Sequence, residues 1–166
     1  RQADVDRNAS ALRRICEAAA PAGIRVTLEF LMISKVRRLS AAAAVVAACD
    51  HPAALILIDA LHLQRAGEGV AGLSELDPGL FPYAQLCDGE LECDDTFEAY
   101  LEDAIDGRSA PGEGALPLDA ILDALPDACP LSLEVRSKRY RDTFPDPVER
   151  AAAILERTQR FLESRV

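Results

Sequence analysis

The sequence is poor in the residues that most zinc proteins and disulfide-stabilised proteins need. It holds two histidines, His51 and His62, so a histidine-rich zinc site cannot be built. Its five cysteines are odd in number and no pair is spaced as C-x-x-C, which disfavours a disulfide framework or a zinc ribbon. We therefore expect reduced thiols in a cytoplasmic protein.

Positive charge and long apolar runs are also scarce. Eighteen Lys and Arg stand against 28 Asp and Glu, a formal net charge of -10, and such a field repels phosphodiester backbones. No apolar run reaches the roughly 20 residues of a membrane helix, and Ala41–Cys49 is too short for one. No signal-peptide pattern opens the sequence. We expect neither a nucleic-acid partner nor a membrane partner.

The length of 166 residues suits a single domain spanning 1–166. Apolar segments typical of strands alternate along it with amphipathic segments typical of helices. Alternation of this kind predicts an α/β fold with a parallel sheet. The expected helices are Asp4–Ala20, 35–48, Asp95–Asp106, Leu118–Leu125 and Pro147–Arg165; the expected strands are Ile24–Phe30, Ala54–Asp59, Tyr83–Cys87 and Leu131–Val135; and Ala60–Pro82 is expected to be a long connection with one short helix between its glycine-rich turns.

Such a sheet belongs either to an open doubly wound fold or to half of an eight-stranded barrel. The doubly wound fold predicts a glycine-rich phosphate loop after the first strand, and the segment Glu29-Phe30-Leu31-Met32 has no glycine. A barrel assembles its active site at the carboxyl ends of its strands, where this sequence places polar residues. The pattern therefore favours a (β/α) TIM-barrel type of fold.

Each predicted strand ends near one oxygen-bearing side chain: Glu29, Asp59, Gln85 and Glu134. A carboxylate avoids a buried strand unless something compensates its desolvation. Three carboxylates and one amide would form an all-oxygen ligand set that favours Mn²⁺ or Mg²⁺ over zinc. The alternative is that each residue is a separate strand-end group bonded to a neighbouring loop.

Two further residues are candidates for contact with a substrate. His62 follows Asp59 by three residues, where it could act as a general acid/base or donate to an oxyanion; the alternative is an exposed loop histidine. Arg108 precedes the loop Pro111-Gly112-Glu113-Gly114 and is a candidate for binding a substrate oxygen. That loop can equally be a plain turn into the next helix.

The sequence resembles the xylose-isomerase-like TIM-barrel superfamily of sugar phosphate isomerases and epimerases over nearly its whole length. The four strand-end residues follow one another at separations of 30, 26 and 49 residues. The motifs that carry the resemblance are Leu28-Glu29-Phe30, Ile58-Asp59-Ala60-Leu61-His62, Gln85-Leu86-Cys87-Asp88, Pro111-Gly112-Glu113-Gly114 and Leu133-Glu134-Val135.

The resemblance implies roles for six residues. Glu29, Asp59, Gln85 and Glu134 would bind the metal, while His62 and Arg108 would face the substrate. In the epimerase members the two glutamates also form the acid/base pair, which implies that Glu29 and Glu134 are catalytic together with His62.

The implied activity is that of a divalent-metal-dependent sugar or sugar phosphate isomerase or epimerase. It would act on a polyhydroxylated carbonyl compound by proton transfer through a metal-stabilised enediolate. Gln85 departs from the histidine of many isomerases and resembles the dehydroshikimate dehydratases of the superfamily. The alternatives are therefore a 3-dehydroshikimate-dehydratase-like lyase with the same metal site, or a binding barrel without catalysis.

The family barrel has eight strands, and the four strands here resemble its strands 5–8, preceded by the helix that leads into strand 5. We expect that the other half of the barrel comes from the same gene product, or that two copies of the chain complete one barrel between them.

Overall fold

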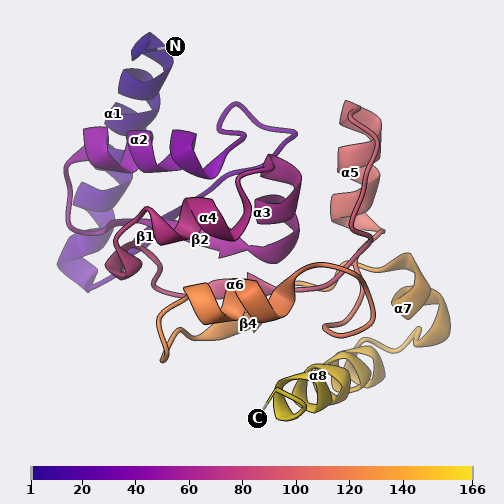
Figure 1. Ribbon diagram of the computed structural model, residues 1–166. Coiled ribbons are helices and arrows are strands. Elements are labelled where there is room, and N and C mark those ends of the chain that lie inside the picture. Colours follow the sequence, from indigo (N-terminus) through magenta and orange to yellow (C-terminus); the bar gives the residue numbers. More distant parts are fainter. Residues whose placement is uncertain (1, 166) are drawn as a thin grey trace.

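The computed structural model describes residues 2–165 (Figure 1) and shows helices alternating with the strands of one parallel sheet. Its elements are α1 (Gln2–Ala19), η1 (Ala20–Ala22), β1 (Val26–Glu29), α2 (Leu39–Cys49), β2 (Ala54–Asp59), α3 (Ala60–Ala66), α4 (Gly69–Ser74), η2 (Pro78–Leu80), β3 (Ala84–Leu86), α5 (Phe97–Ile105), α6 (Leu118–Ala124), β4 (Leu131–Leu133), α7 (Lys138–Thr143) and α8 (Pro147–Glu163). The predicted α/β class is confirmed.

The sheet has the order β1-β2-β3-β4, and each strand is parallel to its neighbour. Parallel strands in chain order need crossover connections, and the helices supply them. Figure 1 shows α1 beyond one end of the sheet, next to β1, and α8 beyond the other end, past β4. The carboxyl ends of all four strands consequently lie along one edge of the sheet.

The two faces of the sheet differ in composition. Ala54, Ile56 and Ile58 of β2 belong to the main hydrophobic core, which α1, α2, α3 and α6 also build. Because side chains alternate along a strand, the intervening Leu55 and Leu57 point to the opposite face. We call that opposite face the inner face; Asp59 lies on it.

The connection after β2 differs from the expectation. It is not mainly loop, because α3 begins at Ala60, immediately after the strand. The Asp59 carboxylate accepts the backbone N–H of His62 at 3.0 Å and thereby caps this helix. The short helix expected between the two glycine-rich turns is present as α4.

Two other differences concern short polar segments. The helix α7 was not expected; Ser137 caps it by accepting the N–H of Tyr140. The expected helix 35–48 begins only at Leu39, because turns occupy the residues before it, with Ser34 Oγ donating to the Val36 carbonyl at 2.8 Å. Among residues 2–165, no helix is long and apolar enough to cross a membrane.

Candidate metal centre

The strand register places all four strand-end oxygens on the inner face. Asp59 is paired with Gln85 across β2 and β3, and residues paired in this way point to the same side of the sheet. Glu29 is paired with Leu57, two residues before Asp59. Gln85 is paired with Ser132, two residues before Glu134. The period of two therefore predicts one common face for the whole set.

Two carboxylates of this face and His62 of α3 meet closely enough to share a cation. Single ligand atoms of Glu29, Asp59 and His62 lie within 4.8 Å of one another. Asp59 is fully buried and His62 is 6% exposed, whereas the Glu29 side chain keeps 30% of its surface. The cluster therefore has one open side, at the carboxylate from β1.

The Asp59 carboxylate uses both of its oxygens. Oδ1 accepts the His62 backbone N–H at 3.0 Å, and Oδ2 accepts Arg108 Nη1 at 2.6 Å. The ion pair is almost wholly removed from water, since the two side chains are 0% and 1% exposed. Each side chain of such a buried pair offsets part of the desolvation cost of the other.

Arg108 is held by more than Asp59. Its Nε donates to the Ala104 carbonyl at 3.1 Å, and its Nη1 also reaches Cys87 Sγ and the Glu134 carbonyl, both at 3.2 Å. Although burial disfavours its charge, the Asp59 carboxylate raises the pKa of Arg108 above the ordinary value. Its predicted contact with a substrate stays a prediction; in the structure the buried guanidinium contacts Asp59 and lies 3.2 Å from His62 Nε2.

His62 lies between the guanidinium and Glu29. Its Nε2 is 3.2 Å from Arg108 Nη2 and 3.9 Å from Glu29 Oε1. Arginine can only donate, so Nε2 is the acceptor and the ring proton is assigned to Nδ1. Burial lowers the pKa of His62, and the charge of Arg108 adds to that lowering while Asp59 opposes it. The histidine is buried and is not the exposed loop residue of the alternative.

Glu134 approaches the cluster from β4. Its Oε2 lies 3.9 Å from Arg108 Nη2, and its side chain is 32% exposed. Burial raises its pKa above the ordinary value, with Arg108 opposing. Glu134 is not one of the three residues whose ligand atoms meet within 4.8 Å. Its carboxylate therefore lies near the Arg108 guanidinium without joining the three-residue cluster.

Gln85 supplies the observation that bears most directly on a metal. Within residues 2–165, its Oε1 is the buried side-chain oxygen that has no hydrogen-bond partner. Leaving such an oxygen unpaired costs about 1–3 kcal/mol, so native proteins rarely keep one without a ligand or water. An amide oxygen next to a carboxylate fits a hard divalent cation. The donor set therefore fits the group that the resemblance implies.

Burial and neighbouring charges change the pKa of Glu29 strongly. Desolvation, followed by the charges of Asp59 and Glu134, raises the pKa of Glu29 to about 7. A carboxyl that titrates near neutral pH can both accept and return a proton under ordinary conditions.

Sequence reasoning missed Asp88, which organises the loop beside the site. This aspartate is 2% exposed, and its carboxylate accepts four backbone N–H groups at 2.9–3.0 Å. The donors are Gly89, Gly112, Gly114 and Leu116. A signal was present, because an aspartate directly after an apolar strand needs a partner, and the glycines follow it in the sequence.

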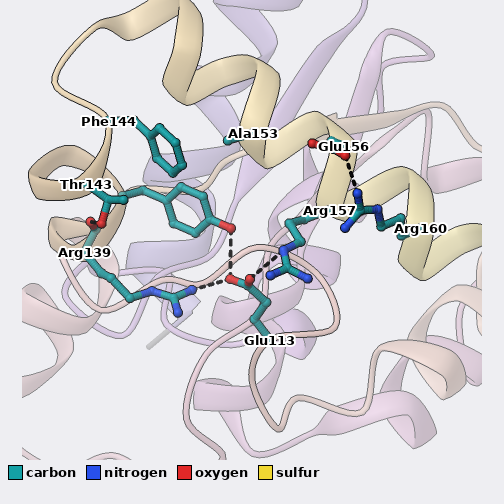
Figure 2. Close-up of a pocket in the computed structure, with 9 residues that line it drawn as sticks. Glu113, Arg139, Thr143, Phe144, Ala153, Glu156, Arg157 and Arg160 are labelled. Atoms are coloured by element: carbon teal, nitrogen blue, oxygen red, sulfur yellow. Dashed lines mark hydrogen bonds and ion pairs between the residues drawn. The ribbon is translucent and has the colours of Figure 1, made fainter.

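Glu113 fixes the same loop to the last two helices. It accepts the Tyr140 hydroxyl at 2.9 Å and Arg157 Nε at 3.0 Å, and it also pairs with Arg139. Figure 2 shows Arg139 and Arg157 pointing toward the Glu113 carboxylate. Together with Tyr140, these residues line a cavity of about 330 Å³ between α7 and α8.

A model of the xylose isomerase-like TIM barrels matches residues 1–164. The chain belongs to this family. The match confirms the resemblance stated from the motifs, and it makes the parallel sheet part of a TIM barrel. A search of curated proteins found no match.

Solved structures agree on the fold of this family member. The IOLI protein with a bound zinc atom has a TM-score of 0.75 and 21% identity, over 93% of this chain and 56% of its own. A xylose isomerase domain protein from Alicyclobacillus acidocaldarius has a TM-score of 0.68 and 25% identity, covering 96% of this chain and 59% of its own. A probable 3-DHS dehydratase, AsbF from Bacillus anthracis, has a TM-score of 0.68 and 21% identity over 86% and 54%. The chain thus spans little more than half the length of these proteins.

Proposed function

We propose that this family member is a divalent-metal-dependent enzyme that isomerises or epimerises a polyhydroxylated carbonyl compound, such as a sugar or a sugar phosphate. The observation that carries the proposal is the buried, unpartnered Oε1 of Gln85 in register with Asp59. Glu29, Asp59, Gln85 and Glu134 would hold the ion, with His62 within reach of it. Mn²⁺ or Mg²⁺ suits the oxygen donors.

A divalent ion bound there would polarise adjacent carbonyl and hydroxyl oxygens of the substrate and acidify the neighbouring C–H. Glu29 is the base that we assign, because it lies at the open side of the cluster and keeps 30% of its side-chain surface exposed. Glu134 stands on the opposite edge strand of the sheet, from which it can return a proton to the other side of the same carbon. His62 keeps its ring proton on Nδ1 because its Nε2 accepts from Arg108 Nη2.

The test is metal content together with proton exchange. Protein purified without chelator should carry close to one Mn²⁺ or Mg²⁺ per chain, and the Gln85→Ala variant should carry much less. With Mn²⁺ added, a panel of ketoses and ketose phosphates should incorporate solvent deuterium at the carbon next to the carbonyl. A clearly substoichiometric metal content without rescue of exchange would favour the binding barrel instead.

A second candidate is a lyase that keeps the same site and expels a β-hydroxyl. Gln85 favours it, because this residue departs from the histidine of many isomerases, and AsbF, described as a probable 3-DHS dehydratase, shares the fold. Incubation of the full chain and Mn²⁺ with 3-dehydroshikimate separates the two proposals. An aromatic absorbance would contradict the isomerase proposal, and its absence alongside exchange into a ketose would contradict the lyase.

A further inference from the structure

The Arg108 guanidinium is a fixed cation in the middle of the ligand set. It contacts Asp59 at 2.6 Å, lies 3.2 Å from His62 Nε2 and approaches Glu134 Oε2 at 3.9 Å. These are three of the groups that gather around the candidate metal position. Arginine cannot lose its proton under ordinary conditions, so this charge is permanent.

The Arg108 guanidinium is fixed in position by burial and by hydrogen bonds. Its side chain is 1% exposed, and the backbone carbonyls of Ala104 and Glu134 hold it from two directions, at 3.1 Å and 3.2 Å. Because the surroundings are dry, the charge is weakly screened and acts strongly on any second cation nearby. A divalent ion bound through Asp59 must share that carboxylate with Arg108.

We propose that Arg108 is an internal counter-ion that takes the place of the metal in the metal-free protein and weakens the affinity of the site for divalent ions. The inference rests on the proposed metal site. It makes Arg108 a positioning residue that acts through Asp59, and it predicts that Asp59 and Glu134 stay close together when no metal is bound. It also predicts that the site binds metal reversibly.

The experiment measures Mn²⁺ binding by calorimetry and by thermal melting, with and without chelator. Arg108→Met removes the guanidinium and nearly keeps the volume of the side chain. We expect the Mn²⁺ affinity of this variant to rise at least tenfold. The melting temperature of this variant should fall in chelator and recover with Mn²⁺ by more than that of the wild type does. Arg108→Lys keeps the charge, so its Mn²⁺ affinity should stay within about threefold of the wild type.

Arg65 offers a matched control. Its side chain is 5% exposed and bonds Asp103 at 2.6 Å, a carboxylate outside the ligand set. Arg65→Met should lower the melting temperature without changing the Mn²⁺ affinity more than about twofold. A gain of affinity in both variants would show a general loosening and would overturn the proposal.

The outcomes separate this inference from the proposed function. If the wild type binds Mn²⁺ and Arg108→Met binds it equally or less well, the counter-ion role is wrong and the metal site stands. If neither protein binds a divalent ion, the metal site itself is wrong and the inference falls with it. If Arg108→Met folds only with Mn²⁺ present, the exchange of one cation for the other is demonstrated directly.

Discussion

Two buried aspartates, Asp59 and Asp88, follow neighbouring strands and are satisfied in opposite ways. Asp59 is neutralised by the guanidinium of Arg108 and accepts one backbone N–H. Asp88 accepts four backbone N–H groups. Four backbone amides fill the acceptor positions of the Asp88 carboxylate. The Asp59 carboxylate accepts fewer hydrogen bonds and therefore keeps lone pairs that a metal can use. The difference separates a carboxylate that builds a loop from one that can bind a ligand.

The strongest way to test this contrast is to replace each carboxylate by its amide. Asp88→Asn turns one acceptor into a donor that faces backbone N–H groups, so we expect a loss of about 3 kcal/mol in the free energy of unfolding. Asp59→Asn removes the charge that compensates the buried Arg108 guanidinium, so we expect a loss of about 3–5 kcal/mol in the metal-free protein. Urea unfolding in chelator measures both. The exposed Asp127 gives the control, since Asp127→Asn should change the free energy by less than about 0.5 kcal/mol.

A loss for Asp59→Asn of less than about 1 kcal/mol would contradict the contrast, because the Arg108 guanidinium would then not depend on this carboxylate. A larger loss for Asp59→Asn would mean that the Arg108 pair, and not the amide cradle, is the main support of this region.

A smaller effect is expected from a methyl group added beside Asp88. A Cβ at Gly114 would lie 2.4 Å from Asp88 Oδ1 and 2.4 Å from the Gly89 carbonyl, so backbone must move. Gly114→Ala should destabilise the protein by about 2 kcal/mol. Gly72→Ala is the matched control. Gly72 lies in α4, where alanine is favoured over glycine, and its added Cβ would meet the side-chain Cβ of Glu68 at 3.2 Å rather than backbone. Thermal melting of both variants measures the difference.

The stability of the protein should also depend on pH through Glu29 of the candidate metal centre. The folded-state pKa of Glu29 is about 7, above its ordinary value of 4.5. The native state therefore holds a proton that the unfolded state has released, so stability falls as pH rises from about 4.5 to about 7. In metal-free protein, Glu29→Gln should flatten this slope, as measured by urea unfolding at several pH values. An unchanged slope in the variant would assign the effect to another group.

Much of the architecture could be predicted from the sequence because its signals are local. Apolar runs at Ala54–Asp59 and Tyr83–Cys87 marked strands, and polar residues at their ends marked the inner face. The helix α3 was missed because Asp59 stood out as a possible ligand, and its second role as an N-cap was not considered. The helix α7 was missed because its six residues are mostly polar and show no apolar periodicity.

The contacts of Arg108 could not be predicted in the same way. Its partner Asp59 lies 49 residues away in the sequence, and nothing local distinguishes a guanidinium that faces a substrate from one buried against a carboxylate. The orphan oxygen of Gln85 is likewise a property of packing. The sequence shows only that an amide stands where an acidic or imidazole ligand is expected.

The Asp88 cradle has a consequence for amide hydrogen exchange. Gly112 and Gly114 lie in an exposed loop, outside any helix or strand, where backbone hydrogens usually exchange with solvent within seconds to minutes. Their N–H groups point instead into a buried carboxylate, and Glu113 between them is fixed to α7 and α8 (Figure 2). These amides can exchange only when the end of β3 opens as well. A loop that connects two elements should therefore exchange as slowly as the strands beneath it.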